Sequence, residues 1–500
     1  MSAFIYTILR TGYLLITHDE ANNYFHWVTR SFGDILLYKG PELPNNHLLN
    51  TLLIKICIYF FGLSEFVIRI PALIGHALYL AGIYKTLKLF LKGPLLVAGI
   101  CFLIFNPFML QIFATGRGYA LGLGFCSIGT YYLLRYIKNQ HAPYATANSL
   151  KEAPRHIDLA FLMFAFATMS GFTFFHIYLS AFIWLAGYEI ATKRSLWKLI
   201  ISVFPSILLL TSTCLLPVIK IHSSHPYIGG LEKGGLWANT VLSLIDGTLY
   251  NQTYFLPWLS HMIQFFIIAV MMIAAVLALI SLKTKNAVLE PALTLLRCVG
   301  AWLMICCILM IGQGGVIKFG YSVGRTAVYF LPLFYLLFLL VIQCLVLLGE
   351  KIKQARTGIY CFIILFAIIS TAHFIHCANL RNFYGMWGAY SESSRDVIEY
   401  LMQARKTEQL KSHSVSIGTH RAYTPMLNFY ITKYDVKWLK RLAYRQDLRQ
   451  HFNYYYLLPN HDGFFEEHEM DKELKAAFLG KHLKVLKVFP EGTCLLQQVW

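Results

Sequence analysis

The sequence predicts a polytopic α-helical membrane protein with a small α/β domain at its C-terminal end. Hydrophobic residues make up 57% of the 500 residues and charged residues only 14%, so the chain is too apolar for a soluble domain with a wet surface. The mean hydropathy of +0.54 agrees with this. Apolar runs long enough to cross a bilayer recur up to residue 377, and after that residue the chain becomes mixed and charged.

Eleven apolar runs are candidates for membrane-spanning helices, because a span needs about 20 apolar residues at about 1.5 Å per residue. The first run is short for a span and contains Arg10. We expect this run to act as a signal anchor, with no cleavable signal peptide. The predicted spans are residues 2–17, 66–84, 94–113, 118–137, 157–173, 175–192, 197–218, 261–282, 292–312, 327–348 and 357–377.

Basic residues predict which side of the membrane each connection faces. With the N-terminus inside, every connection that this topology places in the cytoplasm is basic, as the positive-inside rule requires. The assignment needs residues 47–62, HLLNTLLIKICIYFFG, to lie along the outer membrane surface as an interfacial helix, since a further span would invert every later connection. The basic residues are Lys85, Lys88, Lys92, Arg135, Lys138, Lys151, Arg155, Lys193, Arg194, Lys198, Lys283, Lys285, Arg297, Lys351, Lys353 and Arg356.

The chain therefore divides into a transmembrane domain, residues 1–377, and an extracytoplasmic α/β domain, residues 378–500. After eleven spans the second domain lies outside the cytoplasm. Period-two and helical patterns alternate within it. The strand-like runs are residues 415–419, 454–459, 483–489 and 493–499, and the helical ones are residues 394–406 and 470–479.

Charge and cysteine usage exclude other classes of protein. The net charge of +18 comes from short basic clusters between apolar runs, so we expect no nucleic-acid partner. Most of the 11 cysteines lie in apolar segments, without CxxC pairs or metal-ligand spacing. Only Cys377 and Cys494 could meet outside the membrane, so a disulfide framework is not expected.

Unusual polar residues gather on the predicted outer face. Asp19 and Glu20 follow the first apolar run in THDEANNYFHW, residues 17–27. Aromatic and basic residues begin or join several later helices on the same side. The candidate site residues are Asp19, Glu20, His47, Arg69, Arg117, Tyr119, Lys318, Tyr321 and Arg325.

Each of these residues also has a purely structural interpretation. The acid pair could be a solvated helix end. Arg69 and Arg117 could snorkel to lipid headgroups, although the charge bias gives outer arginines no role in topology. Gly116 and Gly118 could simply permit close helix packing. The combination of an acid pair and several cations on one aqueous face favours a functional site.

The order of these features resembles a known superfamily. An apolar helix, an Asp-Glu pair, an interfacial segment, an R-x-P at Arg69 and an R-x-Y at Arg117 resemble the GT-C membrane glycosyltransferases. The pattern is similar to bacterial members of glycosyltransferase family 39, relatives of the dolichyl-phosphate-mannose protein mannosyltransferases, and to the aminoarabinose transferase of lipid A. It covers residues 15–125 and, more loosely, 324–334. Many relatives carry a Pro-Pro pair where PNNHLLN, residues 44–50, stands here.

The resemblance implies a polyprenyl-phosphate sugar donor, a glycan, lipid or protein acceptor, and a bacterial inner membrane. The sequence shows no Gly-rich nucleotide-binding loop, and this is compatible with a polyprenyl-phosphate donor. The transferred sugar would be a hexose or a pentose. Transfer with inversion at its anomeric carbon needs a base that takes the proton of the acceptor hydroxyl and cations that stabilise the departing phosphate. Asp19 is the candidate base, and Glu20 positions the acceptor or helps to hold a divalent cation. The candidate phosphate ligands are Arg117, Arg325, Lys318, Arg69, Tyr119 and Tyr321, while His47 would contact phosphate or metal.

Two other classes of protein remain open from the sequence. A transporter or lipid-linked-sugar flippase would suit the number of helices, but no paired half-sequences are visible. An O-antigen polymerase or ligase would also handle lipid-linked sugars, usually without the early Asp-Glu pair.

Overall fold

The computed structural model describes most of the chain. The described residues are 2–41, 45–141, 147–224, 230–231, 234–250, 252–254, 256–281, 289–316, 320–349, 352–381, 383, 393–407, 414–457, 482–490 and 492–499. They fold into two compact units, and each unit is built from segments that are separate in sequence. The membrane unit comprises Met1–Leu9, Arg30–Cys57 and Arg69–Ala378, and the C-terminal unit comprises Arg10–Thr29, Ile58–Ile68 and Asn379–Trp500.

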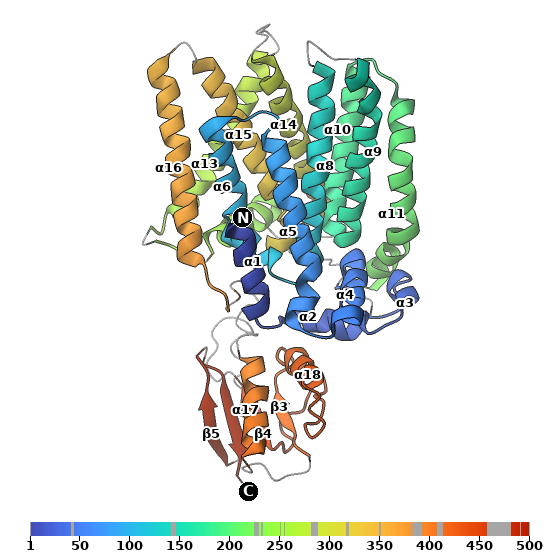
Figure 1. Cartoon of the computed structure of the whole chain (residues 1–500), viewed down its shortest axis with the longest axis vertical. Helices are drawn as coiled ribbons and strands as arrows, with labels where there is room; N and C mark the ends of the chain where they lie inside the picture. Colours follow the sequence, from blue (N-terminus) through green and yellow to red (C-terminus); the bar gives the residue numbers. More distant parts are fainter. Residues whose placement is uncertain are drawn as a thin grey trace. The chain divides into compact units, whose positions relative to one another are not determined.

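The membrane unit is a bundle of long helices (Figure 1). Its helices are α1 (Ser2–Tyr13), α3 (Phe32–Leu36), α4 (Leu48–Phe61), α5 (Glu65–Leu87), α6 (Gly93–Ile104), α7 (Pro107–Phe113), α8 (Gly118–His141), α9 (Ala147–Ser170), α10 (Phe175–Ala191), α11 (Leu196–Ser224), α12 (Leu242–Leu249), α13 (Leu259–Ser281), α14 (Glu290–Ile311), α15 (Phe330–Leu348) and α16 (Lys353–Cys377). Shorter turns are η2 (Phe172–Phe174), η3 (Leu236–Val241), η4 (Gly312–Val316) and η5 (Gly324–Ala327), and β1 (Gly230–Leu231) pairs antiparallel with β2 (Tyr321–Ser322).

The chain is a polytopic membrane protein by the length and apolarity of its helices. Within the described residues seven helices qualify as spans, or eight if the bent pair α6 and α7 counts as one. The seven correspond to predicted runs. They are Glu65–Leu87, Phe172–Ala191, Leu196–Ile221, Leu259–Ile280, Glu290–Val316, Phe330–Leu348 and Gln354–Cys377.

Three of the eleven predicted spans fall short of this test, for different reasons. α1 has only 12 residues, which is about 18 Å of helix. α8 is rich in glycine, tyrosine and basic residues, and α9 begins with a polar stretch, so neither reaches the hydropathy of a lipid-exposed span. Most of the first half of α8 is buried by other helices, and a helix shielded by protein does not need an apolar surface.

The predicted single helix over residues 94–113 is wrong, because the chain bends by 62° between α6 and α7. Asn106 caps α7, accepting a hydrogen bond of 3.1 Å from the backbone N–H of Met109, and Pro107 follows at the first helical position. Proline lacks the N–H that would continue the ladder of α6, so the helix restarts in a new direction.

The predicted interfacial run is a separate helix, α4, of 14 residues. At about 21 Å it is shorter than the bilayer core of about 30 Å. Its last turn exposes three aromatic side chains in succession, Tyr59, Phe60 and Phe61. A short apolar helix with exposed aromatic residues is typical of a segment at a membrane surface.

Glycines allow α5 and α8 to approach closely. A Cβ atom on Gly75 would lie 2.5 Å from the carbonyl oxygen of Ala120, and one on Gly124 would clash with the backbone of Gly75. Lipid supplies no hydrophobic force between helices, so such backbone contact is a main source of stability within a membrane. The sequence predicts glycine-mediated packing at the start of α8, and the structure extends it along the helix.

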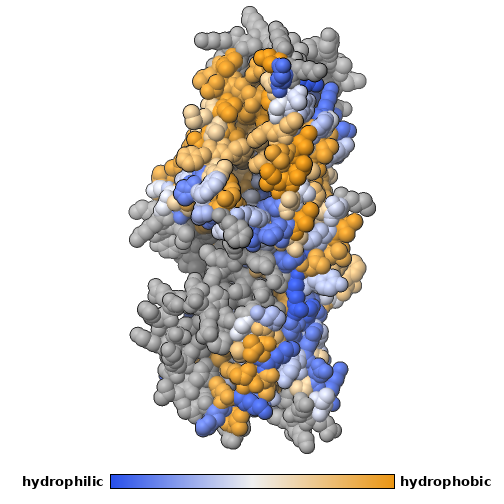
Figure 2. All heavy atoms as spheres, turned by 90° about the vertical axis from the view of Figure 1, so that its left-hand side faces the viewer, coloured by the Kyte–Doolittle hydropathy of each residue, from blue (hydrophilic) through white to orange (hydrophobic). Residues whose placement is uncertain are grey.

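Apolar side chains form large patches on the face of the bundle seen in Figure 2. α13 and α16 are the most exposed spans, each with only 17% of its window buried. Their exposed side chains include Phe265, Met272, Leu279, Leu365, Ile368 and Ile375. Exposed apolar surface of this kind is compatible with lipid contact and would be a liability in water.

The C-terminal unit contains a four-stranded mixed sheet in the order β3-β4-β6-β5. β3 runs parallel to β4, and the other pairs are antiparallel. All four residues of β4 are buried. The elements are α2 (His18–Asn23), η1 (Tyr24–Val28), α17 (Ser394–Lys406), β3 (Ile417–Thr419), α18 (Thr424–Lys433), β4 (Tyr454–Leu457), β5 (Leu483–Val488) and β6 (Cys494–Gln498).

The four predicted strands and the helix over residues 394–406 are therefore confirmed. The predicted helix 470–479 lies outside the described residues. The sequence reading missed α18, whose side chains are almost all buried and therefore show no amphipathic period. All 11 cysteines are free, including Cys377 and Cys494.

Candidate functional site

In the membrane unit, side chains from three separate segments meet around the ring of Tyr119. The imidazole of His47 lies edge-on, with its centre 4.9 Å from the centre of that ring. The guanidinium carbon of Arg325 lies 5.9 Å from the same ring centre. Arg117 is two residues before Tyr119 in the chain. We call His47, Arg117, Tyr119 and Arg325 the outer cluster.

Two arginines of the membrane unit, Arg69 and Arg117, are buried in protein. Arg117 is 5% exposed and Arg69 is fully buried. The Nη1 group of Arg117 donates a hydrogen bond to the side-chain oxygen of Asn45. A guanidinium that snorkelled to lipid headgroups would be exposed at its charged end, so the snorkelling interpretation fails for both residues. A buried cation is costly unless anions or hydrogen-bond acceptors surround it.

Close backbone packing fixes the turn that carries Arg117. The side-chain amide of Asn50 donates to the carbonyl oxygen of Gly116 at 3.1 Å. The Nδ1 atom of His47 lies 3.1 Å from the carbonyl oxygen of Ser170. A Cβ atom on Gly118 would lie 2.8 Å from Cβ of His47 and would clash with the Ser170 carbonyl. Gly118 therefore has the structural role of permitting close approach.

A second turn, just before α15, carries Arg325. Gly324 has φ of +52°, which a residue with a side chain rarely adopts, and its N–H donates to Oγ of Ser243 at 2.9 Å. The hydroxyl of Thr326 accepts from the backbone N–H of Val323 at 2.8 Å. The side chain of Arg325 is half-buried. Hydrogen bonds on both sides of Arg325 thus hold its backbone in one conformation.

Tyr321, another predicted phosphate ligand, lies in β2 just before this turn. The ring of Tyr321 packs flat against Gly314, where a Cβ atom would lie 2.5 Å from the ring. Thr240 donates to the carbonyl oxygen of Ser322 at 2.7 Å, which ties β2 to η3. Lys318 lies outside the described residues.

The loop between α3 and α4 supports the outer cluster. Tyr38 is buried with φ of +52°, and its pKa is raised by burial, while a hydrogen bond with the backbone of Asn46 and the charge of Arg117 act in the opposite direction. Nζ of Lys220, near the end of α11, donates to the carbonyl oxygens of Leu37 at 2.9 Å and Tyr38 at 3.3 Å. The loop is therefore held at its base and presents Asn45 to Arg117.

In the C-terminal unit, the acid pair lies in the first turn of the short helix α2. Thr17 caps this helix: its hydroxyl accepts from the N–H of Glu20 at 3.3 Å, and its own N–H donates to Oε2 of Glu20 at 2.8 Å. Glu20 is 1% exposed, whereas Asp19 is half-buried. Glu20 thus has a capping role, and Asp19 is the more accessible carboxylate.

Basic side chains of the C-terminal sequence lie near this helix. Burial, together with the charges of Arg421 and His18, lowers the pKa of His420 to about 4. Nε2 of His18 lies 2.8 Å from the side-chain nitrogen of Asn22. Sequence reasoning did not identify His420, because nothing in its local pattern connects it with residues 400 positions earlier.

The described residues contain no group of three or more His, Cys, Asp or Glu side chains arranged to hold a metal ion. The structure brings together four of the predicted site residues in the outer cluster. Sequence reasoning missed their supports, Asn45, Asn50 and Lys220, because an isolated polar residue in a loop or within an apolar helix carries no sign of its distant partner.

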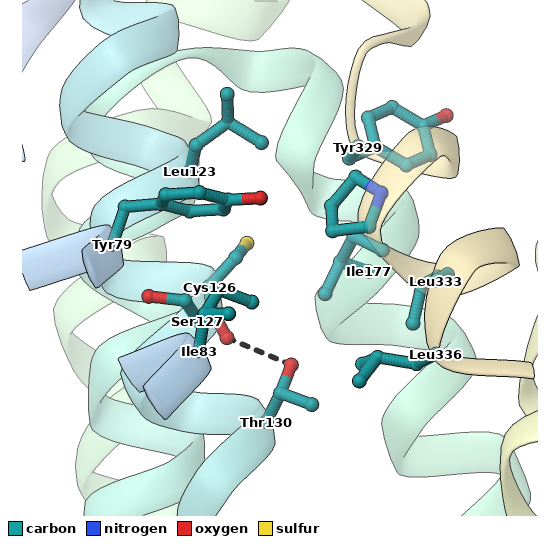
Figure 3. A pocket seen from close by; sticks show the side chains of 11 residues that line it. Tyr79, Ile83, Leu123, Cys126, Ser127, Thr130, Ile177, Tyr329, Leu333 and Leu336 are labelled. Atoms are coloured by element: carbon teal, nitrogen blue, oxygen red, sulfur yellow. Dashed lines mark hydrogen bonds between the residues drawn. The ribbon is translucent and has the colours of Figure 1, made fainter. Parts of the chain in front are cut away.

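A small cavity inside the bundle is not a candidate substrate site. It holds about 20 Å³, enough for about one water molecule, between α5, α8, α10 and α15 (Figure 3). Three of its hydroxyl groups donate to backbone carbonyls, Tyr79 to Leu103 at 2.8 Å, Ser127 to Gly124 at 2.7 Å and Thr130 to Cys126 at 2.8 Å. A sugar or prenyl chain does not fit such a volume.

Comparison with known proteins finds similarity in structure only. No family model and no curated protein sequence matches this chain. The crystal structure of ArnT from Cupriavidus metallidurans in the apo state matches with a TM-score of 0.51 and 11% identity, over 99% of this chain and 96% of that one. The same protein bound to undecaprenyl phosphate matches with a TM-score of 0.50 and 12% identity, over the same shares.

A third similar structure is the archaeal oligosaccharyltransferase AglB from Archaeoglobus fulgidus, in complex with an inhibitory peptide and a dolichol-phosphate. It has a TM-score of 0.44 and 13% identity, over 86% of this chain and 59% of that one. At these identities the two ArnT structures show a shared fold that extends over almost the whole chain.

Proposed function

From the GT-C fold of this chain, we propose that it is an inverting glycosyltransferase. It moves a hexose or pentose from a polyprenyl-phosphate donor to an acceptor hydroxyl of a glycan, lipid or protein. The observation that carries the proposal is the outer cluster, in which His47 and Arg325 come from distant segments to the ring of Tyr119, two residues after the buried Arg117. ArnT, which has the same fold, is described as bound to undecaprenyl phosphate, and this supports a polyprenyl-phosphate carrier.

The proposed reaction needs a base for the acceptor hydroxyl and positive charge for the leaving phosphate. The acceptor oxygen attacks the anomeric carbon while the carboxylate of Asp19 takes its proton. The bond between that carbon and the phosphate oxygen breaks, and the lipid phosphate leaves with the electron pair. A base in position contributes about 10²- to 10⁴-fold to such a rate. Asp19 suits the role because it is the more accessible of the two acids.

The departing phosphate needs fixed positive charge. Arg117 and Arg325 are the first choices, because one is buried and hydrogen-bonded and the other is held on the ring of Tyr119. Preorganised cations away from water stabilise developing negative charge most strongly. Arg69 and Lys318 are proposed as further cations, Tyr119 and Tyr321 as hydroxyl donors, and His47 as a ligand of phosphate or metal.

Glu20 has a second proposed role besides its cap. Its buried carboxylate holds the first turn of α2, and so the backbone of Asp19, in one conformation. It also positions the acceptor or binds a divalent cation whose other ligands come from substrate and water. Loss of transfer on chelation with EDTA, with recovery on adding Mg²⁺ or Mn²⁺, would support the cation.

The proposed active face is extracytoplasmic, in a bacterial inner membrane. The basic residues of the alternate connections support this orientation through the positive-inside rule. A face outside the cytoplasm lacks nucleotide sugars, and this agrees with a lipid-linked donor.

The test is transfer by the purified full-length protein. Radiolabelled polyprenyl-phosphate sugars are incubated with candidate acceptors in detergent, and the label must become covalently attached to an acceptor. Asp19→Asn should lower the rate by about 10²- to 10⁴-fold without loss of folded protein. Asp435→Asn is the matched control, because Asp435 is an exposed acid with φ of +49°, which asparagine tolerates. A transporter would bind donor without forming product, and an active Asp19→Asn variant would remove the assignment of the base.

A further inference from the structure

Helix α18 contacts the segment that carries the acid pair. The phenolic oxygen of Tyr430 accepts a hydrogen bond of 3.1 Å from the backbone N–H of Ile16, 414 residues earlier. Both residues are fully buried. Ile16 immediately precedes Thr17, which caps α2. The neighbouring Phe429 meets Tyr24 edge-on, with ring centres 5.9 Å apart, just after α2.

One turn further along α18, a second side chain reaches the start of α5. Nζ of Lys433 lies 2.5 Å from Oε2 of Glu65, and the side chain of Glu65 is only 6% exposed. The same ammonium group lies 5.7 Å from the ring centre of Tyr430 and 5.1 Å from that of Tyr434. This ion pair ties α18 to the segment Ile58–Ile68 of the same compact unit, because removing one partner would leave the other charge uncompensated.

α2 is too short to be stable without packing against other segments, even with its cap. It has only six residues, and isolated helices of fewer than about 12 residues are marginal in water. Its position therefore depends on what packs against it. The buried N–H of Ile16 also requires an acceptor, and Tyr430 supplies one.

We propose that α18 is a clamp that positions the acid pair, with Tyr430 and Lys433 as its positioning residues. The C-terminal sequence is then a part of the catalytic machinery and not a separable cap. Tyr430 fixes the backbone just before α2, and Lys433 fixes the segment Ile58–Ile68 of the same compact unit. The catalytic consequence rests on the proposed role of Asp19, whereas the clamp itself rests only on the contacts of α18.

Hydrogen–deuterium exchange of the full-length protein tests the clamp without any substrate. In Tyr430→Phe the amides of residues 14–23 should exchange about 3- to 10-fold faster, as expected from the loss of one buried hydrogen bond. Tyr434→Phe is the matched control, because it also removes a phenolic hydroxyl, at the C-terminal end of α18, but one that donates to Glu399 at 2.7 Å. Unchanged exchange at residues 14–23 in Tyr430→Phe would overturn the proposal.

The ion pair is tested in the same way. Lys433→Met should speed exchange at residues 58–68, whereas Lys437→Met should not, because Lys437 and its partner Asp435 are both largely exposed. Equal exchange in the two variants would contradict the role of Lys433.

Kinetics separate positioning from simple loss of folded protein. Tyr430→Phe should lower kcat several-fold and leave the KM for donor unchanged, because the proposed phosphate ligands belong to the other compact unit. A fall in active-site titre with kcat per active molecule unchanged would indicate a purely structural role. If exchange changes as expected but Asp19→Asn remains active, the clamp stands and the proposed function fails.

Discussion

The guanidinium of Arg117 donates a hydrogen bond to the side-chain oxygen of Asn45, which lies 72 residues earlier in the chain. The contact joins the loop between α3 and α4 to the turn before α8 and keeps a buried charge in one orientation. A cation that is already oriented loses little entropy when a phosphate binds. Substitutions of Arg117 and of Asn45 therefore separate two effects on donor binding, that of the positive charge and that of its orientation.

Arg117→Ala should raise the KM for donor by about 10- to 100-fold. This is the loss in affinity expected when one charge-assisted hydrogen bond to phosphate is removed. Asn45→Ala should have a smaller effect in the same direction, because the charge remains and only its orientation is lost. Arg135→Ala is the control, since Arg135 lies on α8, the helix that follows Arg117, and donates to Tyr131. Donor titration of the transfer rate measures all three. Equal KM values for Arg117→Ala and wild type would leave Arg117 only a structural role.

The ring of Tyr119 supports Arg325 as well as supplying a hydroxyl, and two substitutions separate these roles. Tyr119→Leu removes the ring and should weaken donor binding about 2- to 5-fold, because a cation–π contact contributes about 0.5–1 kcal/mol at an accessible site. Tyr119→Phe keeps the ring and removes only the hydroxyl. If Tyr119→Phe loses as much donor affinity as Tyr119→Leu, the hydroxyl is the important group.

Gly118→Ala should prevent correct packing at the start of α8, because the added methyl group would clash with the backbone of Ser170. Overpacking a tight contact usually costs about 1–3 kcal/mol, and a backbone clash costs more than a side-chain one. Gly187→Ala in α10 meets nothing within 4 Å and is the matched control. The yield of monodisperse protein in detergent and its thermal unfolding temperature are the measurements. A stable Gly118→Ala variant would show that this turn can move.

The stability of the C-terminal unit should fall as the pH falls from about 6.5 to about 4. Burial lowers the pKa of His420 to about 4 in the folded protein, against 6.5 for an ordinary histidine. The unfolded chain therefore binds the proton first, so this contribution to stability is complete above pH 6.5 and is lost as the pH drops towards 4.

Thermal unfolding of wild type and His420→Gln across this pH range measures the effect. The wild-type unfolding temperature should decline more steeply than that of His420→Gln. His482→Gln, at an exposed position, should follow the wild type. Parallel curves for wild type and His420→Gln would contradict the assignment of this pH dependence to His420.

Much of the fold could be predicted from local patterns. Seven spans, the short helix α4, the four strands of the C-terminal sheet and α17 all lie where the apolar periods indicate. The errors also have local causes. The bend at Asn106 needed the combined effect of a cap and a proline, and α18 is buried on nearly all sides, which leaves no period to detect.

The candidate site was less predictable. Arg117, Tyr119, Arg325 and His47 attracted attention because cations and aromatic residues are unusual at outer helix ends. Their supports did not, because Asn45, Tyr430 and Lys433 look ordinary until the fold brings distant segments to them. Only proximity distinguishes a structural polar residue from an exposed one.

By itself the sequence determined that this chain is a polytopic helical membrane protein, because its apolar runs match the thickness of a bilayer and its polar residues fall between them. It also determined which residue types were available for chemistry at the outer helix ends. Only the tertiary structure decided that Glu20 caps its own helix, that Arg117 is buried against Asn45, and that α2 packs on a helix more than 400 residues later. The physical reason is that membrane insertion depends on local hydropathy, whereas the position of a side chain depends on contacts between segments that no local pattern records.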